Sequence, residues 1–507
     1  MAQIQSLVLL VSSMTLSEKR TFRAQACQTA NKPNYLVLYE IIEKNGTLPV
    51  AGLREKFMAE LPAASFETAV KYLFGLILET MLQLRQEQDS FYDLFNKILK
   101  ARVLYEKSLF DECFELLDEV MLRAEKYENY YALLFASRLE LEYLLALGFP
   151  HLTEKDLLQK QFKINESLKY IRKINEQSSL FEILKHRIIY KGHPRSQQQK
   201  NELNDLVFSE LSMIASQNLE NFEIRKLHQL FQSNYLISVG DYNSALRSYY
   251  ELNTLFEANK HLWSNPPVYY LNVLEGVLES LRSIRNYDEM THFIEQLKKL
   301  ESASADFRLN LTCLTFQYEL FPHLDRGDFN TCLSLMNQYK SSLYDKLSNL
   351  DRVRQTELCL YTSLVYLGIS EFHKARKFLN QVFMGVKNFS FLPLYRTIRL
   401  VNLIILYKLG DFDVITYEIR SMKRDLSGTI KGYKIERYLF RFLIQPPQTN
   451  INRNIQWEKA KAVFDEIRPD IFEQQILRIF DFTAWVESEI RKVPLAEVLQ
   501  GKMEPGK

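Results

Sequence analysis

The chain has 507 residues, with 64 lysines and arginines against 62 aspartates and glutamates, so its formal net charge at pH 7 is +2. This balance provides no strong field for nucleic acid or an anionic membrane, and a content of 47% hydrophobic and 13% aromatic residues excludes a disordered chain. Only 15 glycines and 14 prolines are present, which disfavours turn-rich β-sandwiches and suits long helices.

Cysteine usage and apolar patterning indicate a reducing compartment. The cysteines are odd in number and form no C-x-x-C pair, at positions 27, 113, 313, 332 and 359. This pattern fits neither a disulfide framework nor a zinc site. The apolar run Leu7–Val11 lacks the basic start and the length of a secretory signal. No stretch approaches the ~20 apolar residues that cross a bilayer, so we expect a cytoplasmic protein with no membrane partner.

Residues 1–90 do not share the pattern of the rest of the chain and are predicted to form a helical head or cap. Four helices are expected there, at about 16–29, 34–44, 50–60 and 66–87. The first opens with Thr15 and Glu18, which have the spacing of a capping box. The head is therefore predicted to be helical throughout.

The last three predicted helices of the head have the order of a helix-turn-helix core. A recognition helix needs side chains that reach base edges and phosphates, whereas residues 65–74 carry one lysine, Lys71, beside a glutamate, Glu67. No wing hairpin is predicted after them. We therefore favour a cap that closes the repeat region, with a DNA-binding head as the alternative.

A short turn sequence recurs beyond the head. Three copies of Gly-Asp-aromatic are present, at Gly240-Asp241-Tyr242, Gly327-Asp328-Phe329 and Gly410-Asp411-Phe412. Looser versions occur at Ser108-Leu109-Phe110, Arg285-Asn286-Tyr287 and Ser370-Glu371-Phe372. Glycine allows the left-handed C-cap where one helix ends, and aspartate can cap the next helix. Each copy therefore predicts a helical hairpin.

The turns are regularly spaced and share an apolar stripe. Counted from the aromatic residue of each turn, the last four intervals are 45, 42, 43 and 40 residues. A small or apolar residue follows three positions after each aromatic: Cys113, Ala245, Met290, Cys332, Ala375 and Ile415. An apolar residue follows seven positions after: Leu117, Tyr249, Ile294, Met336, Leu379 and Ile419. These two positions share one helical face, so we expect the stripe to pack in the core.

Helix, Gly-Asp-aromatic turn and a second helix with a small residue near its start resemble the tetratricopeptide-repeat (TPR) superfamily. The units of 40 to 45 residues exceed the standard TPR length of about 34. The resemblance implies an all-α, TPR-like α-solenoid of stacked antiparallel helix pairs with a helical N-terminal head, similar to uncharacterised bacterial TPR-like proteins. We predict the head at 1–90, the repeats at 91–492 and a frayed C-terminal tail at 493–507.

Sequence signatures of catalysis and of cofactor binding are absent. There is no G-x-G-x-x-G or G-x-x-x-x-G-K-[ST] loop, no H-E-x-x-H and no G-x-S-x-G. His292 and Glu295 share a helical face, but one pair of this kind is more typical of a surface than of a metal site. Cys113 and Cys332 take a position that alanine fills in other units, which predicts core residues. We therefore expect a non-enzymatic protein without a cofactor.

Opposite charges gather in two stretches. Residues 391–454 hold eleven lysines and arginines against five acids, a net charge of +6, and residues 110–143 hold three against nine, a net charge of −6. The candidate docking residues of the basic stretch are Arg420, Lys423, Arg424, Lys431, Lys434, Arg437 and Arg441. Solvated outer faces are the alternative interpretation of both stretches. Asn234 and Asn272 are further candidates, because first helices of TPR-like pairs line the concave face.

The predicted function is a non-enzymatic protein–protein interaction scaffold or adaptor with a protein or peptide partner. Nucleic acid is not expected, because the aromatic residues of the basic stretch have core spacing rather than the exposure that base stacking needs. The alternative function is a transcriptional or signalling regulator, with a helix-turn-helix-like head and repeats that sense a peptide.

Overall fold

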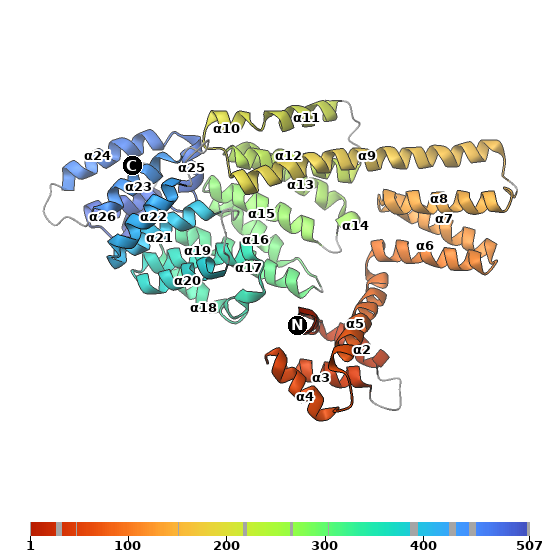
Figure 1. Cartoon of the computed structure of the whole chain (residues 1–507). Helices are drawn as coiled ribbons and strands as arrows, with labels where there is room; N and C mark the ends of the chain where they lie inside the picture. The colour runs from red at the N-terminus through yellow and green to blue at the C-terminus, as the bar shows by residue number, and fades with distance from the viewer. Residues whose placement is uncertain are drawn as a thin grey trace. The chain divides into compact units, whose positions relative to one another are not determined.

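The computed structural model describes residues 2–26, 33–46, 48–150, 152–215, 221–263, 267–302, 304–385, 394–424, 432–445 and 453–503 (Figure 1). Within these ranges every regular element is a helix and no strand occurs, so the fold is all-α. The chain divides into two compact units. Unit 1 comprises Met1–Ile174, Lys260–Pro267 and Glu301–Arg308, and unit 2 comprises Asn175–Asn259, Val268–Leu300 and Leu309–Lys507.

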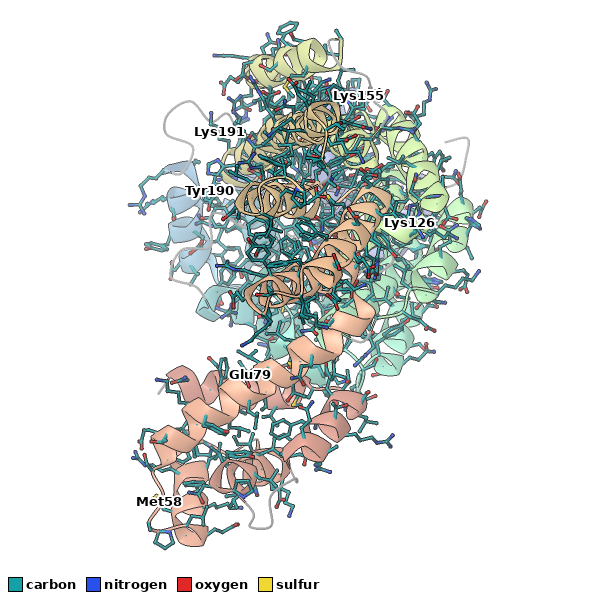
Figure 2. All side chains as sticks on the ribbon, turned by 90° about the vertical axis from the view of Figure 1, so that its right-hand side faces the viewer. Met58, Glu79, Lys126, Lys155, Tyr190 and Lys191 are labelled. Carbon is teal, nitrogen blue, oxygen red and sulfur yellow. The ribbon has the colours of Figure 1, made fainter. Side chains whose placement is uncertain are left out.

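The first helices of unit 1 form a core of their own. They are α1 (Ala2–Ser13), α2 (Leu16–Ala26), α3 (Asn34–Asn45), α4 (Val50–Glu60) and α5 (Phe66–Gln88). Their shared hydrophobic cluster runs from Ile4 to Ile77, and Figure 2 shows Met58 on α4 and Glu79 on α5. The sequence did not predict α1, which buries Leu7 and Val11 in this cluster. The capping box is confirmed, because the Thr15 N–H donates to Glu18 at 2.7 Å and the Glu18 N–H to the Thr15 hydroxyl at 3.2 Å.

Unit 1 continues with helices that pack in chain order. They are α6 (Ser90–Glu106), α7 (Phe110–Lys126), α8 (Tyr130–Ala146), the first part of α9 (Glu154–Lys191) and the short α14 (Lys260–Trp263). A second hydrophobic cluster, from Leu94 to Tyr143, joins α6, α7 and α8. The change from one cluster to the next lies near residue 90, while the predicted limits of the head and of the repeats stay predictions.

Unit 2 contains the end of α9 and most of the remaining helices. In chain order they are α10 (Gln197–Asn201), α11 (Asn204–Ala215), α12 (Phe222–Ser238), α13 (Tyr242–Ala258), α15 (Val268–Ser283), α16 (Tyr287–Lys298), α17 (Ala305–Asp325), α18 (Phe329–Gln338), a 3-10 helix (Tyr344–Asn349), α19 (Arg352–Gly368), α20 (Phe372–Gly385), α21 (Tyr395–Leu409), α22 (Phe412–Arg424), α23 (Lys434–Ile444), α24 (Arg453–Ile467), α25 (Ile471–Leu477), α26 (Phe482–Arg491) and α27 (Leu495–Met503). Several helices that follow each other in the chain pack together, as α12 with α13 and α19 with α20 do.

The predicted turns lie between these helices. The turn glycines Gly240, Gly327 and Gly410 have φ values of 81°, 76° and 81°, the left-handed conformation that a side chain disfavours. In the looser turns the same conformation is taken by Ser108, Arg285 and Ser370. Aspartate caps the next helix in two copies: Asp241 accepts from the Ser244 N–H at 3.1 Å and Asp328 from the Thr331 N–H at 3.2 Å. Asp411 instead pairs with Arg376 at 2.7 Å.

The apolar stripe is confirmed as the centre of each helix pair. All six residues three positions after the turn aromatics are 0% exposed, and all six residues seven positions after are at most 8% exposed. Neighbouring pairs touch so closely that glycine is required in two places. A Cβ on Gly276 of α15 would lie 2.1 Å from Tyr249 of α13, and one on Gly368 of α19 would lie 2.3 Å from Phe329 of α18.

The end of the chain packs against turns that precede it by up to 237 residues. The Gln475 side chain donates to the Ser238 carbonyl at 3.1 Å, and Arg478 donates to the Ser283 hydroxyl at 3.0 Å. We call residues 471–503 the C-terminal segment; its helices (blue in Figure 1) lie beside the end of α12. The frayed tail predicted from residue 493 is wrong as far as residue 503, because α27 forms there and packs on α26.

Candidate functional site

Six of the seven cations predicted for docking lie on two helices of unit 2 that pack against each other, α22 and α23. Six of them are exposed, and we call these six the basic region: Arg420, Lys423, Arg424, Lys434, Arg437 and Arg441. Lys431, the seventh candidate, lies outside the described residues. Lys434 forms an ion pair with Asp470 at 3.1 Å. The other helices of unit 2 thus leave this cationic surface uncovered.

Four cations of the basic region form no ion pair with any described residue: Arg420, Lys423, Arg437 and Arg441. Their side chains therefore keep a full positive charge in contact with water. Clustered charge of one sign raises the local concentration of oppositely charged partners and speeds their encounter. The region is suited to electrostatic docking of an acidic surface.

Other cations of the basic stretch are used inside the protein. Three of them form ion pairs: Arg396 with Glu436 at 2.8 Å, Arg399 with Glu418 at 2.8 Å and Lys408 with Glu489 at 2.5 Å. Arg399 is only 6% exposed, and its pair with Glu418 offsets the cost of burying its charge. The count of eleven cations in the sequence is therefore an overestimate of the positive charges offered to a partner.

The two candidate asparagines are not part of this region. On α12, the amide of Asn234 donates to the Leu230 carbonyl at 2.8 Å, and its side-chain oxygen accepts from Lys185 at 2.9 Å. On α15, Asn272 is exposed. Because Asn234 already uses its amide and its oxygen within the protein, it is poorly placed to bind an extended peptide backbone.

A second polar site, which the sequence did not predict, lies within unit 2. Six ionisable residues surround a cavity of about 180 Å³ and are here called the charged cluster: Glu275, Glu279 and Arg282 on α15, Arg354 and Glu357 on α19, and Arg478 just after α25. The three elements that carry them are separated by as many as 200 residues in the chain. The turn packing of the C-terminal segment brings Arg478 to the two earlier helices.

Ion pairs connect the members of the charged cluster. Arg354 forms a bidentate pair with Glu275, with both distances 2.6 Å, and reaches Glu357 at 3.1 Å. Arg478 pairs with Glu279 at 2.5 Å. Bidentate pairing of this kind fixes both side chains as well as their charges. The cluster therefore joins α15 to α19 and both to the C-terminal segment.

Arg282 is the most deeply buried member and is fully satisfied. It is 4% exposed and makes a bidentate pair with Asp325 at 3.0 and 2.9 Å. It also donates to the Tyr361 hydroxyl at 3.1 Å, and its guanidinium carbon lies 3.5 Å from the Phe321 ring centre. A buried charge needs such partners to offset its loss of hydration.

The carboxyl group of Glu357 has an unusual acidity. Burial, followed by the repulsion of Glu275, raises its pKa to about 7 against the attraction of Arg354. Near neutral pH this group is therefore partly protonated. The signal that could have found the cluster is the spacing on each helix, with charges at 275, 279 and 282 on α15 and at 354 and 357 on α19. Nothing local indicates that these faces meet.

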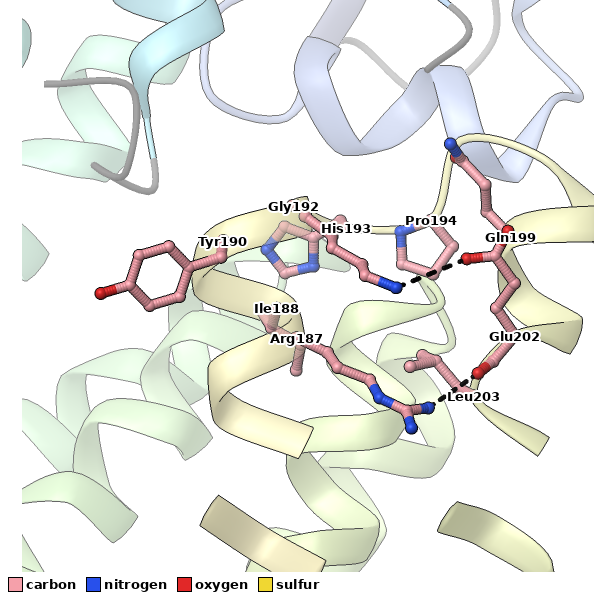
Figure 3. Close-up of a pocket in the computed structure, with 10 residues that line it drawn as sticks. Arg187, Ile188, Tyr190, Gly192, His193, Pro194, Gln199, Glu202 and Leu203 are labelled. Carbon is pink, nitrogen blue, oxygen red and sulfur yellow. Dashed lines mark hydrogen bonds and ion pairs between the residues drawn. The ribbon is translucent and has the colours of Figure 1, made fainter. Parts of the chain in front are cut away.

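Another pocket, of about 190 Å³, lies at the end of α9 (Figure 3). Arg187 donates to the Glu202 carbonyl at 2.8 Å across it, and Tyr190 and Lys191 lie at the same end of α9 (Figure 2). Burial lowers the pKa of His193 to about 4, so its imidazole is neutral at pH 7. Its Nδ1 atom has no hydrogen-bond partner among the described residues, so the carboxylate of Glu202 in the lining does not orient it as a catalytic base.

The predicted core cysteines and the weak metal pair can also be placed. Cys113 and Cys332 are 0% exposed, and burial raises the pKa of Cys332 to about 12. Both thiols are thus protonated core residues. His292 contacts Gln296 at 3.0 Å and Glu295 pairs with Lys298 at 2.9 Å. The described part of the chain contains no group of three side chains suited to a metal ion.

Comparison with models of protein families, with curated proteins and with solved structures finds no match. None of the described helices combines the length and the apolar character that a bilayer span requires.

Proposed function

We propose that the protein is a non-enzymatic, TPR-like helical-repeat scaffold in the cytoplasm that docks an acidic protein segment on its basic region. The observation that carries this proposal is the set of four exposed cations on α22 and α23 that no described residue neutralises. Unpaired cations on neighbouring helices favour a partner that supplies carboxylates.

The repeated packing supports the scaffold part of the proposal. Turn aromatics recur every 40 to 45 residues from Tyr242 onward, and the stripe after each of them is buried. A helix pair of this kind cannot bury its apolar face alone and is stabilised by its neighbours. Stacked pairs of this type provide a long, rigid surface, which is the usual basis of binding in helical-repeat proteins.

The charged cluster supports an outer rather than an inner docking surface. Its arginines already have carboxylate partners at 2.5 to 3.0 Å. One of these arginines, Arg478, belongs to the C-terminal segment. An incoming peptide would have to displace these pairs and leave charges buried without partners, which is costly. The exposed cations of α22 and α23 present no such barrier.

The test uses the full chain and a fluorescein-labelled peptide of sixteen glutamates, with binding followed by anisotropy. The docking variant carries Arg420→Glu, Lys423→Glu, Arg437→Glu and Arg441→Glu. A matched control carries the same reversals at exposed cations elsewhere in unit 2, which have no ion pair among the described residues: Arg247, Lys299, Lys340 and Lys377. Both variants have the same net charge, so only the position of the reversals differs.

We expect the docking variant to lose at least about tenfold in affinity and the control to lose much less, with binding of the unchanged chain weakened by salt. Equal losses in the two variants would mean that only net charge matters and would remove the basic region from the proposal. Tighter binding of a uridine oligonucleotide of equal charge would replace the protein partner by nucleic acid.

A further inference from the structure

A cavity of about 600 Å³ lies between the C-terminal segment and the turns of three helix pairs in unit 2. The turns contribute Tyr242, Arg285 and Tyr287, and the opposite wall begins at the end of α24 with Arg468. This volume is within the range of about 300 to 1,000 Å³ that is usual for small-molecule sites. The cavity exists only because the end of the chain returns to these turns.

The acceptor groups of this cavity are already occupied. Asp325 accepts the bidentate pair from Arg282 and a hydrogen bond from the Tyr287 hydroxyl at 3.0 Å. Asp481 accepts from Lys502 at 3.0 Å and from the Thr483 hydroxyl at 2.6 Å. Both carboxylates that line the cavity are therefore neutralised by the protein itself.

Three donors of the same cavity make no hydrogen bond to an oxygen atom of the described residues. The Tyr242 hydroxyl is buried and has no hydrogen-bond partner among the described residues. Arg285 hydrogen-bonds in the described chain only to the Met503 sulfur, at 3.3 Å. Arg468 is mostly exposed and forms a long ion pair with Asp465 at 3.7 Å, beyond hydrogen-bond distance. The cavity lining has five cations against two anions. What the cavity lacks is negatively charged oxygen.

The remaining lining is largely apolar. It includes Phe329, Ile471, Leu477, Phe480 and Leu499 from the turns and the C-terminal segment. A site with an apolar wall and a few convergent polar groups binds molecules that match both parts. An anionic head could accept hydrogen bonds from Tyr242 and the arginines while an apolar body covers the wall.

We propose that this cavity binds a small amphipathic anion, with a head of negatively charged oxygens and an apolar body of roughly ten carbons. The Arg478 guanidinium lies 5.0 Å from the Tyr242 ring centre, so positive charge flanks the unpartnered hydroxyl. Burial raises the pKa of Tyr242, which keeps the hydroxyl protonated as a donor. A bound anion would hold the C-terminal segment to the turns, because it contacts both.

The test is calorimetric titration of the full chain with decanoate, compared with decanol and decylamine. We expect one molecule of decanoate to bind, and decanol to bind at least about tenfold more weakly, because it lacks the charged oxygens. Decyl phosphate serves as a second anion and distinguishes a carboxylate head from a phosphate head. Equal affinity for decanoate and decanol would overturn the proposal.

Variants locate the site. Tyr242→Phe removes only the hydroxyl, and Arg285→Gln with Arg468→Gln removes charges at exposed positions, so all three are expected to fold. Each change should weaken decanoate binding severalfold, and the triple variant should abolish it. Arg247→Gln, which removes an exposed cation of α13 outside the cavity, should leave it unchanged. Full decanoate binding by the triple variant, with an unchanged circular-dichroism spectrum, would contradict the proposed site.

Discussion

The charged cluster and the basic region use the same side chains in opposite ways. In the cluster, arginines from α15, α19 and the C-terminal segment each meet a carboxylate at 2.5 to 3.0 Å. On α22 and α23, four cations of equal charge meet none among the described residues. The charges of the charged cluster are paired because removing an unpaired ion from water is costly, while a charge that stays in water needs no partner.

This contrast separates structural charge from charge available for binding. Arg396 and Arg420 belong to one basic stretch of the sequence, but Arg396 holds Glu436 in the interior and Arg420 is exposed. A variant of the first kind is expected to change stability, and a variant of the second kind only recognition. Each prediction below tests one side of this distinction.

The largest effect is expected for Arg354→Met. The variant removes the ion-pair partner of Glu275 and of Glu357, so two carboxylates that are only 26% and 21% exposed lose their compensating charge. Breaking a buried pair in this way costs about 3 kcal/mol of the free energy of unfolding, which urea denaturation would measure. The double variant that also carries Glu275→Met should regain most of the lost stability. A single variant as stable as the unchanged chain would show that the pair is only a surface contact.

The next effect is a dependence of stability on pH. The folded-state pKa of Glu357 is about 7, above the usual carboxyl value of 4.5, so the folded chain binds more protons than the unfolded chain between these values. Stability should therefore fall as pH rises from about 4.5 through 7, by roughly 2 kcal/mol from this group, and become level at about pH 8.

Glu357→Gln tests this dependence directly. The amide cannot titrate, so only the unchanged chain should lose stability as the pH rises. The free energy of unfolding of the variant minus that of the unchanged chain should therefore increase from pH 5 to pH 7.5. The reason is that the unchanged chain alone has to hold a charged carboxyl at the higher pH. Parallel curves of stability against pH for the two proteins would contradict the raised pKa.

Most of the local fold could be predicted from the sequence because it depends on short-range patterns. The turn glycines and the apolar stripe, at three and seven positions after each turn aromatic, can be recognised within a single helix pair. Residues of this stripe such as Cys332 and Ile415 are buried as expected. The first helix was missed because Leu7–Val11 was too short to stand out by itself. The helix Leu495–Met503 was missed because the residues at the end of the sequence were interpreted as a frayed tail.

The candidate site was less predictable because it depends on contacts between distant segments. The pair of Arg354 and Glu275 spans 79 residues, and no local signal reports that spacing. The basic stretch was recognised, but its composition does not separate Arg399, which pairs with Glu418, from exposed Arg437. The packing of the helix pairs decides which of these arginines is paired inside the protein and which is exposed.

A smaller effect is expected for Lys434→Met, at the boundary between the two kinds of charge. Lys434 pairs with Asp470 at 3.1 Å, but its side chain is 43% exposed. Exposed pairs contribute about 0.2 to 1 kcal/mol, so the loss in the free energy of unfolding should be roughly 0.5 kcal/mol and should shrink in high salt. A loss similar to that of Arg354→Met would place Lys434 on the structural side.

The smallest effect on stability is expected for Arg437→Gln with Arg441→Gln on α23. Neither side chain has an ion pair among the described residues, and glutamine is nearly as good a helix former as arginine. The free energy of unfolding should therefore change by less than about 0.5 kcal/mol, while binding of the glutamate peptide weakens severalfold. Measuring both quantities on one preparation is decisive for the contrast, because a loss of stability would make these arginines structural and a loss of neither would make them ordinary solvated charge.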